Sequence, residues 1–132
     1  MSVFLSYSSR DADVVKTLAQ GLEAAKQDVW FDHELKGGEV WWTSILDKIR
    51  NCSVFVFAVS DSSSESKPCR SELDYATTLG RPILPIRVGP VSALRISPIA
   101  EMQIMDYDPD VAQSGFAVLA AVQDAVSTLL DS

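Results

Sequence analysis

The sequence has few of the cysteine and histidine side chains that commonly bind zinc. The chain has 132 residues, with two cysteines, Cys52 and Cys69, and one histidine, His33. A zinc site needs about four Cys, His or carboxylate ligands at close spacing, and the two cysteines form no CxxC pair. Two buried, reduced thiols are therefore expected, and neither a metal nor another cofactor is expected.

Several common catalytic motifs are missing from the sequence. No GxGxxG, GxxxxGK[ST] or GxSxG segment occurs, which argues against dinucleotide-binding, P-loop and serine-hydrolase chemistry. A Ser-His-Asp triad would have to use His33, which lies in a polar loop. A phosphoacceptor receiver domain needs acidic residues after its first and third strands, where this chain has YSS at 7–9 and VS at 59–60.

The composition indicates an acidic globular protein. Apolar residues make up 47% of the chain and the formal net charge is −7. Nucleic-acid backbones are bound by clustered Lys and Arg, and no basic run occurs, so no nucleic-acid partner is expected. The N-terminus lacks the features of a signal peptide, and no segment reaches the ~20 apolar residues of a membrane span. A cytoplasmic protein without a membrane partner is expected.

Apolar periodicity predicts the elements that must position any site. Short apolar runs predict strands, and apolar residues at helical spacing predict amphipathic helices. Strands are expected at residues 3–7, 29–31, 53–59, 83–88 and 103–106. Helices are expected over residues 11–26, 41–49, 68–79 and 116–129, with one helical turn near 91–95. Loops are expected at residues 32–39 and 60–67.

Prolines and glycines refine these boundaries. Pro68 suits the first turn of the third helix, where its missing N–H costs nothing, and Gly80 suits the end of that helix. Pro85 cannot donate to a strand ladder, so the fourth strand is expected to be short.

Strands that alternate with helices predict an α/β fold, a doubly wound five-stranded parallel sheet with helices on both faces. One domain over residues 1–132 is expected. In such folds ligands bind beyond the carboxyl ends of the strands, where the strand order reverses. The loops 6–10, 32–40 and 60–72 are expected there, and all three are polar.

Four sequence blocks, in order along the chain, resemble the TIR (Toll/interleukin-1 receptor) domain family. They are VFLSYSSRD, DHELKGGEVWW, CSVFVFAVS and PCRSELDYA. The resemblance covers essentially residues 2–130 and implies a flavodoxin-like five-stranded parallel sheet. Many animal members are adaptors that only associate with other TIR domains. Many bacterial and plant members cleave NAD+ between nicotinamide and ribose, and the resemblance here is to the bacterial type.

The resemblance assigns catalysis to Glu72. In the enzymatic members the catalytic residue is a Glu of the third helix within a SEL-type segment, here Ser71, Glu72 and Leu73. One carboxylate is sufficient, because the nicotinamide of NAD+ is already a cation and departs neutral without a general acid. An anion near the ribose would stabilise its developing oxocarbenium charge. Without the resemblance, Glu72 would be a carboxylate favoured by the helix dipole, worth about 0.3–1 kcal/mol.

Other substrate-binding residues are expected from their positions. The family's first strand lines the nucleotide pocket. Arg10 is a candidate for a phosphate of NAD+ and Asp32 for a ribose hydroxyl, with a solvated arginine and a turn residue as equal alternatives. Enzymatic members often carry Trp four residues before the Glu, where this chain has Pro68, so Trp41 or Trp42 would have to stack on the ligand, the alternative being core packing. The expected substrate-binding residues are Phe4, Ser6, Tyr7, Ser8, Arg10, Asp32, Trp42 and Ser71.

The loop at 32–40 resembles the family's BB loop, which docks against a neighbouring domain and helps to complete the site. Its expected assembly residues are His33, Leu35, Gly37 and Gly38, with an ordinary flexible surface loop as the alternative. The two glycines would allow the loop to move.

The resemblance thus implies an NAD+ glycohydrolase that is activated by self-association with other TIR domains. Its product would be ADP-ribose or a cyclic isomer, its role anti-phage defence, and its sensor a C-terminal domain beyond this sequence. One alternative is a non-enzymatic TIR scaffold, which Pro68 favours. Another is a nucleoside deoxyribosyltransferase-like enzyme, against which the BB-type loop argues.

Overall fold

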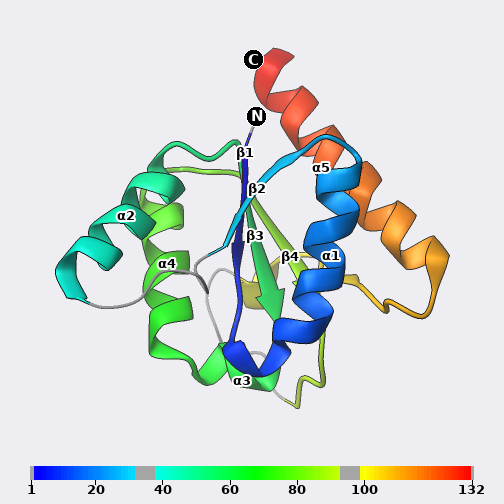
Figure 1. Cartoon of the computed structure of the whole chain (residues 1–132), viewed down its shortest axis with the longest axis horizontal. Coiled ribbons are helices and arrows are strands. Elements are labelled where there is room, and N and C mark those ends of the chain that lie inside the picture. Colours follow the sequence, from blue (N-terminus) through cyan, green and yellow to red (C-terminus); the bar gives the residue numbers. More distant parts are fainter. Residues whose placement is uncertain (1, 32–37, 93–98, 132) are drawn as a thin grey trace.

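The computed structural model describes residues 2–31, 38–92 and 99–131, with side chains at 2–30, 43–92 and 99–127. Helices and strands alternate along the chain, as Figure 1 shows. In chain order the elements are β1 (Ser2–Ser6), η1 (Ser9–Asp11), α1 (Ala12–Ala24), β2 (Asp28–Phe31), α2 (Gly38–Arg50), β3 (Val54–Val59), α3 (Asp61–Glu65), α4 (Lys67–Thr78), β4 (Ile83–Arg87), η3 (Ile99–Glu101), β5 (Met105–Asp106) and α5 (Ala112–Asp131).

The five strands form one parallel sheet in the order β2-β1-β3-β4-β5. This confirms the predicted doubly wound α/β fold, and the order is that of flavodoxin-like proteins. The chain runs from β1 outward to β2, then crosses back to β3 and continues to β4 and β5. The strand order therefore reverses between β1 and β3, which pair directly, with Leu5 opposite Val56.

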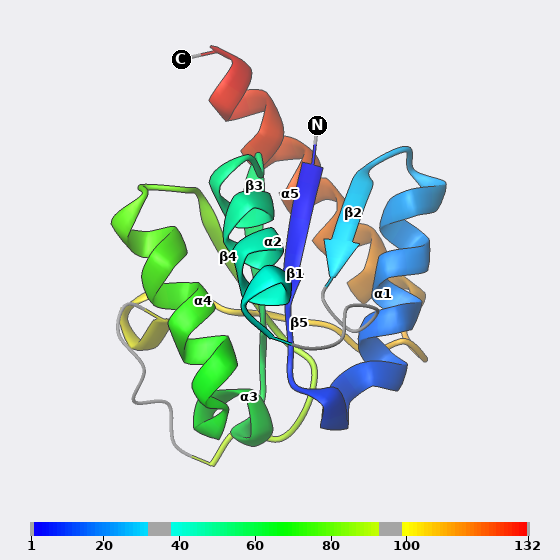
Figure 2. The ribbon, with the colours of Figure 1, turned by 60° about the vertical axis from the view of Figure 1, so that its left-hand side comes forward.

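Two helical layers cover the sheet, one on each face. In Figure 1, α1 and α5 lie on one side of the strands and α2 and α4 on the other, and Figure 2 brings α2 and α4 forward. We call these the α1/α5 layer and the α2/α4 layer. Because side chains alternate along a strand, Val3 and Leu5 of β1 pack in the α1/α5 layer, whereas Phe4 packs in the α2/α4 layer.

The predicted loop at 60–67 is wrong, because its first half forms the short helix α3. Ser60 caps this helix in a reciprocal arrangement, with its hydroxyl accepting from the Ser63 N–H and the Ser63 hydroxyl accepting from the Ser60 N–H. Asp61 lies in the first turn, where the helix dipole favours an acidic side chain. Serines that suggest a loop by composition here supply the cap.

The boundaries of α4 follow its proline and glycine as predicted, whereas Pro85 lies in the middle of the five-residue β4 and does not shorten it. Pro68 lies in the first turn of α4, and Gly80 follows the helix with a φ of +71°, a left-handed conformation that glycine adopts without strain. In β4, Pro85 pairs with Phe57 of β3, while β5 pairs with β4 only from Ile86 onward. Pro85 therefore lies where β4 has a neighbouring strand on one side only, which is where a proline is tolerated.

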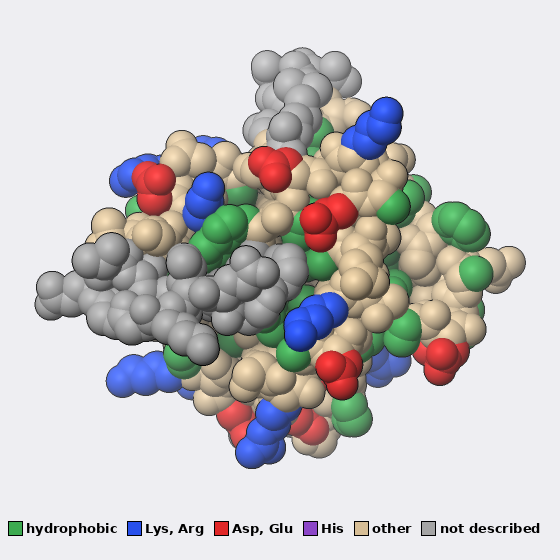
Figure 3. Space-filling model, in the orientation of Figure 1, with side chains coloured by type: hydrophobic (Ala, Val, Ile, Leu, Met, Phe, Trp, Pro, Cys, Tyr) green, Lys and Arg blue, Asp and Glu red, His purple; other side chains and the backbone are tan. Residues whose placement is uncertain are grey.

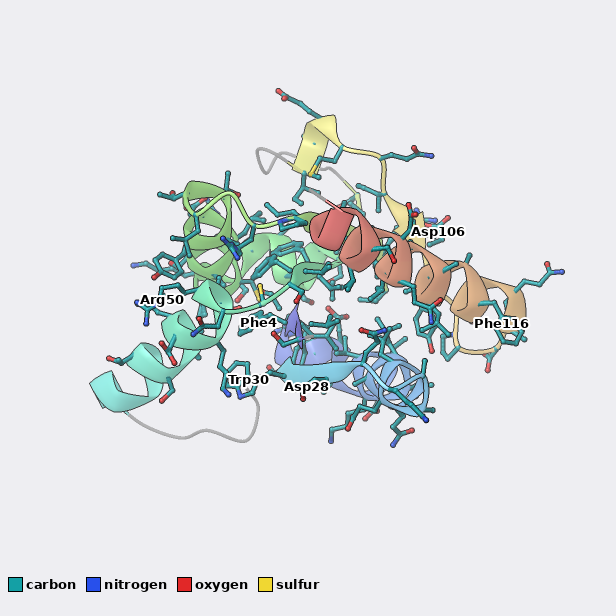
Figure 4. The ribbon with its side chains drawn as sticks, turned by 90° about the horizontal axis from the view of Figure 1, so that it is seen from above. Phe4, Asp28, Trp30, Arg50, Asp106 and Phe116 are labelled. Carbon is teal, nitrogen blue, oxygen red and sulfur yellow. The ribbon has the colours of Figure 1, made fainter. Side chains whose placement is uncertain are left out.

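Three further features differ from the sequence-based expectations. α2 begins at Gly38, so Gly38 and Glu39 lie in a helix and not in the predicted loop. η3 was not predicted, and the expected turn near 91–95 falls largely outside the described residues. Phe116, part of the apolar pattern of the last helix, is 70% exposed near the start of α5 (Figure 4). Within the described residues, no helix is long and apolar enough to cross a membrane.

Candidate functional site

Glu72 is buried on the inner face of α4. Ser66 caps the start of the helix, and its hydroxyl accepts from the N–H of Cys69. Its buried residues recur three or four positions apart and so form one stripe against the sheet. They are Cys69, Glu72, Leu73 and Ala76. The side chain of Glu72 is 1% exposed, so a residue that is usually solvated stands within the apolar layer.

A hydrogen bond joins this carboxyl to β1, an interior strand of the sheet. The hydroxyl of Ser6, the last residue of β1, donates to Oε1 of Glu72 at 2.6 Å. Ser6 is completely buried and lies 66 positions from Glu72 in the sequence. Since β1 flanks the point where the strand order reverses, the pair lies where ligands bind in doubly wound folds.

The side chains around this pair are mostly apolar. Phe4 is 1% exposed and stacks on Trp30 and on Phe55, at ring-centroid distances of 5.0 and 5.4 Å. Figure 4 shows Phe4 and Trp30 close to the sheet. Cys52 and Cys69 are free thiols in the same layer, as predicted. Burial raises the pKa of Cys52 to about 11, so its thiol is neutral at neutral pH.

A second polar cluster ties together the carboxyl ends of three strands. The Ser60 hydroxyl, just after β3, donates to Oδ2 of Asp11 in η1 at 2.5 Å. Gly89, just after β4, lies so close that a Cβ there would meet both Asp11 and Ser60 at 3.3 Å. Oδ1 of Asp61 accepts from the N–H and the hydroxyl of Ser92, at 2.8 and 3.0 Å. The edge that carries Ser6 is thereby fixed at several points.

Sequence reasoning missed both sets of contacts. Ser6 was expected to bind substrate and Glu72 to act on it, but nothing in the sequence pairs two residues so far apart. Asp11 and Ser60 were expected only as the first residues of the helix at 11–26 and of the loop at 60–67. A usable indication was available, because serines that follow two adjacent parallel strands must lie at the same edge of the sheet.

The structure brings some predicted substrate-binding residues together and separates others. Phe4 and Ser6 lie in the α2/α4 layer with Glu72. Tyr7 is 7% exposed and packs in the α1/α5 layer on the opposite face. The other described ones lie nearer the surface: Ser8 caps η1, Ser71 is half-buried, and Arg10 is exposed.

The remaining predicted residues cannot be placed against the site. Asp32, His33, Leu35 and Gly37 lie outside the described residues, as does the side chain of Trp42. Gly38, expected in the assembly loop, is the first residue of α2. The predicted contribution of the 32–40 loop stays a prediction.

Two cavities formed by described residues lie away from Glu72. One, of about 330 Å³, lies between α1 and α5 beside Leu18, Gly21 and Phe116. The other, of about 570 Å³, lies beside Arg87, Asp106 and Tyr107 at the ends of β4 and β5. Neither is lined by Ser6 or Glu72, so chemistry and not cavity size singles out the buried pair.

Charged side chains on the surface do not gather by sign on the face in Figure 3. Among its described residues, Lys and Arg side chains are interspersed with Asp and Glu. Phosphate backbones are bound by clustered cations, so this face does not have the electrostatic form of a nucleic-acid site.

The fold and the buried carboxyl at the switch point define a flavodoxin-like α/β protein with a polar site between β1 and α4. The family model described as TIR domain matches residues 3–119, and the chain belongs to this family. A comparison with curated proteins gave no match.

Solved structures of similar fold include TIR domains and an enzyme. The TIR domain of the Toll-related receptor TRR-2 from Hydra magnipapillata is 23% identical, with a TM-score of 0.74, over 93% of this chain and 96% of that one. The CMP N-glycosidase BcmB from Clostridium botulinum is 16% identical, with a TM-score of 0.63, over 93% and 98%. The heterodimer of the RPS4 and RRS1 TIR domains gives 13% identity and a TM-score of 0.64, over 95% and 98%. At these identities the likeness concerns the fold.

Proposed function

We propose that this TIR domain is an NAD+ glycohydrolase that uses Glu72 to cleave the bond between nicotinamide and ribose. The burial of Glu72 is the observation that carries the proposal. A carboxyl that is 1% exposed in a largely apolar layer is costly for stability, and such groups are concentrated at functional sites. Its place beside the carboxyl end of β1 agrees with ligand binding at the switch point.

The reaction suits a single carboxylate. The bond between ribose C1′ and the nicotinamide nitrogen breaks, and its electron pair neutralises the pyridinium. Positive charge develops on the ribose, where the Glu72 carboxylate stabilises it. Water then adds at C1′ and loses a proton, which gives ADP-ribose; capture by an adenine nitrogen gives a cyclic isomer instead. No acid has to protonate the leaving group, in contrast to ordinary glycosidases.

Access to Glu72 supports activation by assembly. A substrate cannot touch a side chain that is 1% exposed unless neighbouring residues move. We propose that self-association through the 32–40 loop opens the site, with Arg10, Asp32 and Trp42 contributing to NAD+ binding. The heterodimer of two TIR domains among the fold neighbours supports association of such domains in general. We further propose a cytoplasmic role in anti-phage defence, with the activating sensor in a C-terminal domain.

A second candidate is cleavage of a nucleotide with a neutral base. The fold neighbour BcmB is a CMP N-glycosidase, which also breaks an N-glycosidic bond. Cytosine leaves as an anion unless it is protonated, so this reaction needs an acid in addition to Glu72. A third candidate is a TIR scaffold without activity, for which the exposed Pro68 in place of an aromatic is the supporting feature.

The proposal is tested with protein clustered on beads or by fusion to an oligomeric carrier. Clustered protein is incubated with NAD+ or with CMP, and the release of nicotinamide or cytosine is followed. We expect nicotinamide release that falls at least about 100-fold in Glu72→Ala, and little cytosine. Cytosine release that depends on Glu72 would favour the second candidate. No release of either base from clustered protein would favour the scaffold.

A further inference from the structure

The hydrogen bond between Ser6 and Glu72 joins two buried side chains of different elements, β1 and α4. Ser6 is 0% and Glu72 1% exposed, and the O–O distance is 2.6 Å. Hydroxyl donors to a carboxylate lie at about 2.5–2.7 Å, shorter than between neutral groups. The distance between Ser6 and Glu72 lies within this range.

This contact determines what Ser6 can do. A serine hydroxyl has one proton to donate, and here the proton goes to Oε1 of Glu72. While that bond is made, Ser6 cannot also donate to a substrate. The one proton that Ser6 can donate is therefore used on the carboxyl, and through this bond Ser6 can act on a reaction.

We propose that Ser6 is a positioning residue for Glu72. Its hydroxyl holds the side chain of Glu72 in the ionised form at the C-terminal end of β1. This assignment rests on the proposed function and replaces the direct substrate contact expected for Ser6. Glutamate has several rotatable bonds, and a donor on the interior strand β1 fixes where its Oε1 lies. Ser6 thus provides what a surrounding apolar layer cannot, a hydrogen bond to a buried anion.

The side chains around Glu72 make the hydrogen bond from Ser6 important for the ionised carboxylate. Besides Glu72, the titratable side chains buried in the described part of the α2/α4 layer are the thiols Cys52 and Cys69. α2 contributes the apolar Ile45 and Ile49 to the layer. The described charged side chains of the elements packed against α4 are exposed or half-buried: Asp47, Lys48 and Arg50 of α2, and Asp61 and Glu65 of α3.

The test compares Ser6→Ala, which removes the donor, with Ser6→Thr, which keeps a hydroxyl. Ser2→Ala is the matched control, since Ser2 lies at the other end of β1 and its hydroxyl donates to the Asn51 carbonyl. In protein labelled with ¹³C at glutamate carboxyls, the Glu72 resonance is assigned from its loss in Glu72→Gln, and its titration midpoint is measured. This readout is independent of activity.

We expect the midpoint of Glu72 to rise by about one unit or more in Ser6→Ala, because the lost bond stabilised the ionised form. Ser6→Thr should reverse at least half of this rise, and Ser2→Ala should leave the midpoint unchanged. In clustered protein, kcat for nicotinamide release should fall about tenfold in Ser6→Ala with KM changed less than twofold, and the acid limb of the pH profile should move upward.

A Glu72 midpoint in Ser6→Ala within about 0.2 units of wild type would overturn the assignment, as would a loss confined to KM. If clustered wild type releases no nicotinamide, the proposed function fails, and the titration alone still decides whether Ser6 sets the ionisation of Glu72. A midpoint that rises in an inactive protein would therefore confirm the contact and reject the reaction.

Discussion

The two layers on either side of the sheet are built on different principles. In the α1/α5 layer, β1 presents Val3 and Leu5 to an apolar cluster that also holds Leu22 of α1. In the α2/α4 layer, the same strand presents Phe4 and then Ser6, which meets the buried Glu72. One strand thus serves two faces, one that stabilises the fold and one that contains a polar pair costly to bury. The comparison indicates that stability and chemistry are divided between the faces.

The largest expected effect on stability is in the α1/α5 layer. Leu22 is 1% exposed, so Leu22→Ala should lower the free energy of unfolding by about 2–5 kcal/mol, measured by urea denaturation. Nicotinamide release per folded molecule should stay within twofold of wild type. Glu72→Gln should behave in the opposite way, with stability nearly unchanged or higher, because replacing a buried charge is often neutral or stabilising.

This prediction tests most strongly whether the two layers have separate roles. If Leu22→Ala reduced release per folded molecule as strongly as Glu72→Gln, the two faces would not be functionally separate.

The second prediction concerns pH and Cys52. Burial raises the pKa of the Cys52 thiol from 9.0 to about 11, whereas an unfolded thiol keeps its ordinary value. The folded state therefore favours the protonated thiol. The resulting contribution to the free energy of unfolding is complete below about pH 9 and is lost as the pH rises towards 11. Stability should fall by about 2–3 kcal/mol more in wild type than in Cys52→Ala over that interval.

Denaturation curves of both proteins at several pH values provide the measurement. If the stabilities of wild type and Cys52→Ala changed equally with pH, the Cys52 thiol would not be desolvated. The description of the α2/α4 layer as shielding Cys52 from water would then be wrong.

The smallest expected effect is at the surface, outside both layers. Arg87 and Asp106 form an ion pair at 2.6 Å with side chains that are 50% and 68% exposed. Solvent screens such pairs, so Asp106→Asn should change the unfolding free energy by less than about 0.5 kcal/mol, as judged from the thermal midpoint. A loss above about 1 kcal/mol would mean that the edge of the sheet depends on charge as well as on packing.

The sequence predicts most of the fold, because the helices and strands have strong local patterns. The apolar run at 53–59 becomes the fully buried β3, and Pro68 and Gly80 bound α4 closely. The error at α3 arises because its cap uses Ser60 and Ser63 instead of the Ser and Glu of an ordinary capping box. Such a cap is hard to distinguish from a serine-rich loop by composition alone.

The candidate site is predicted in part. Glu72 was selected by its resemblance to a family motif, and its burial gives that choice a physical basis. The contact of Ser6 with Glu72 was missed because the two residues lie 66 positions apart and only the folded sheet brings them together. The alternation along β1 does predict that Phe4 and Ser6 share a face and that Tyr7 faces the other way.

The central claim is that Glu72 acts in N-glycosidic bond cleavage, and one comparison of matched variants tests it most directly. Glu72→Gln and Asp74→Asn each convert one carboxylate of α4 to an amide, but Glu72 is buried and Asp74 is exposed. At equal clustering, we predict that nicotinamide release from NAD+ falls at least about 100-fold in Glu72→Gln and stays within twofold of wild type in Asp74→Asn. Equal release by wild type and Glu72→Gln would contradict the account.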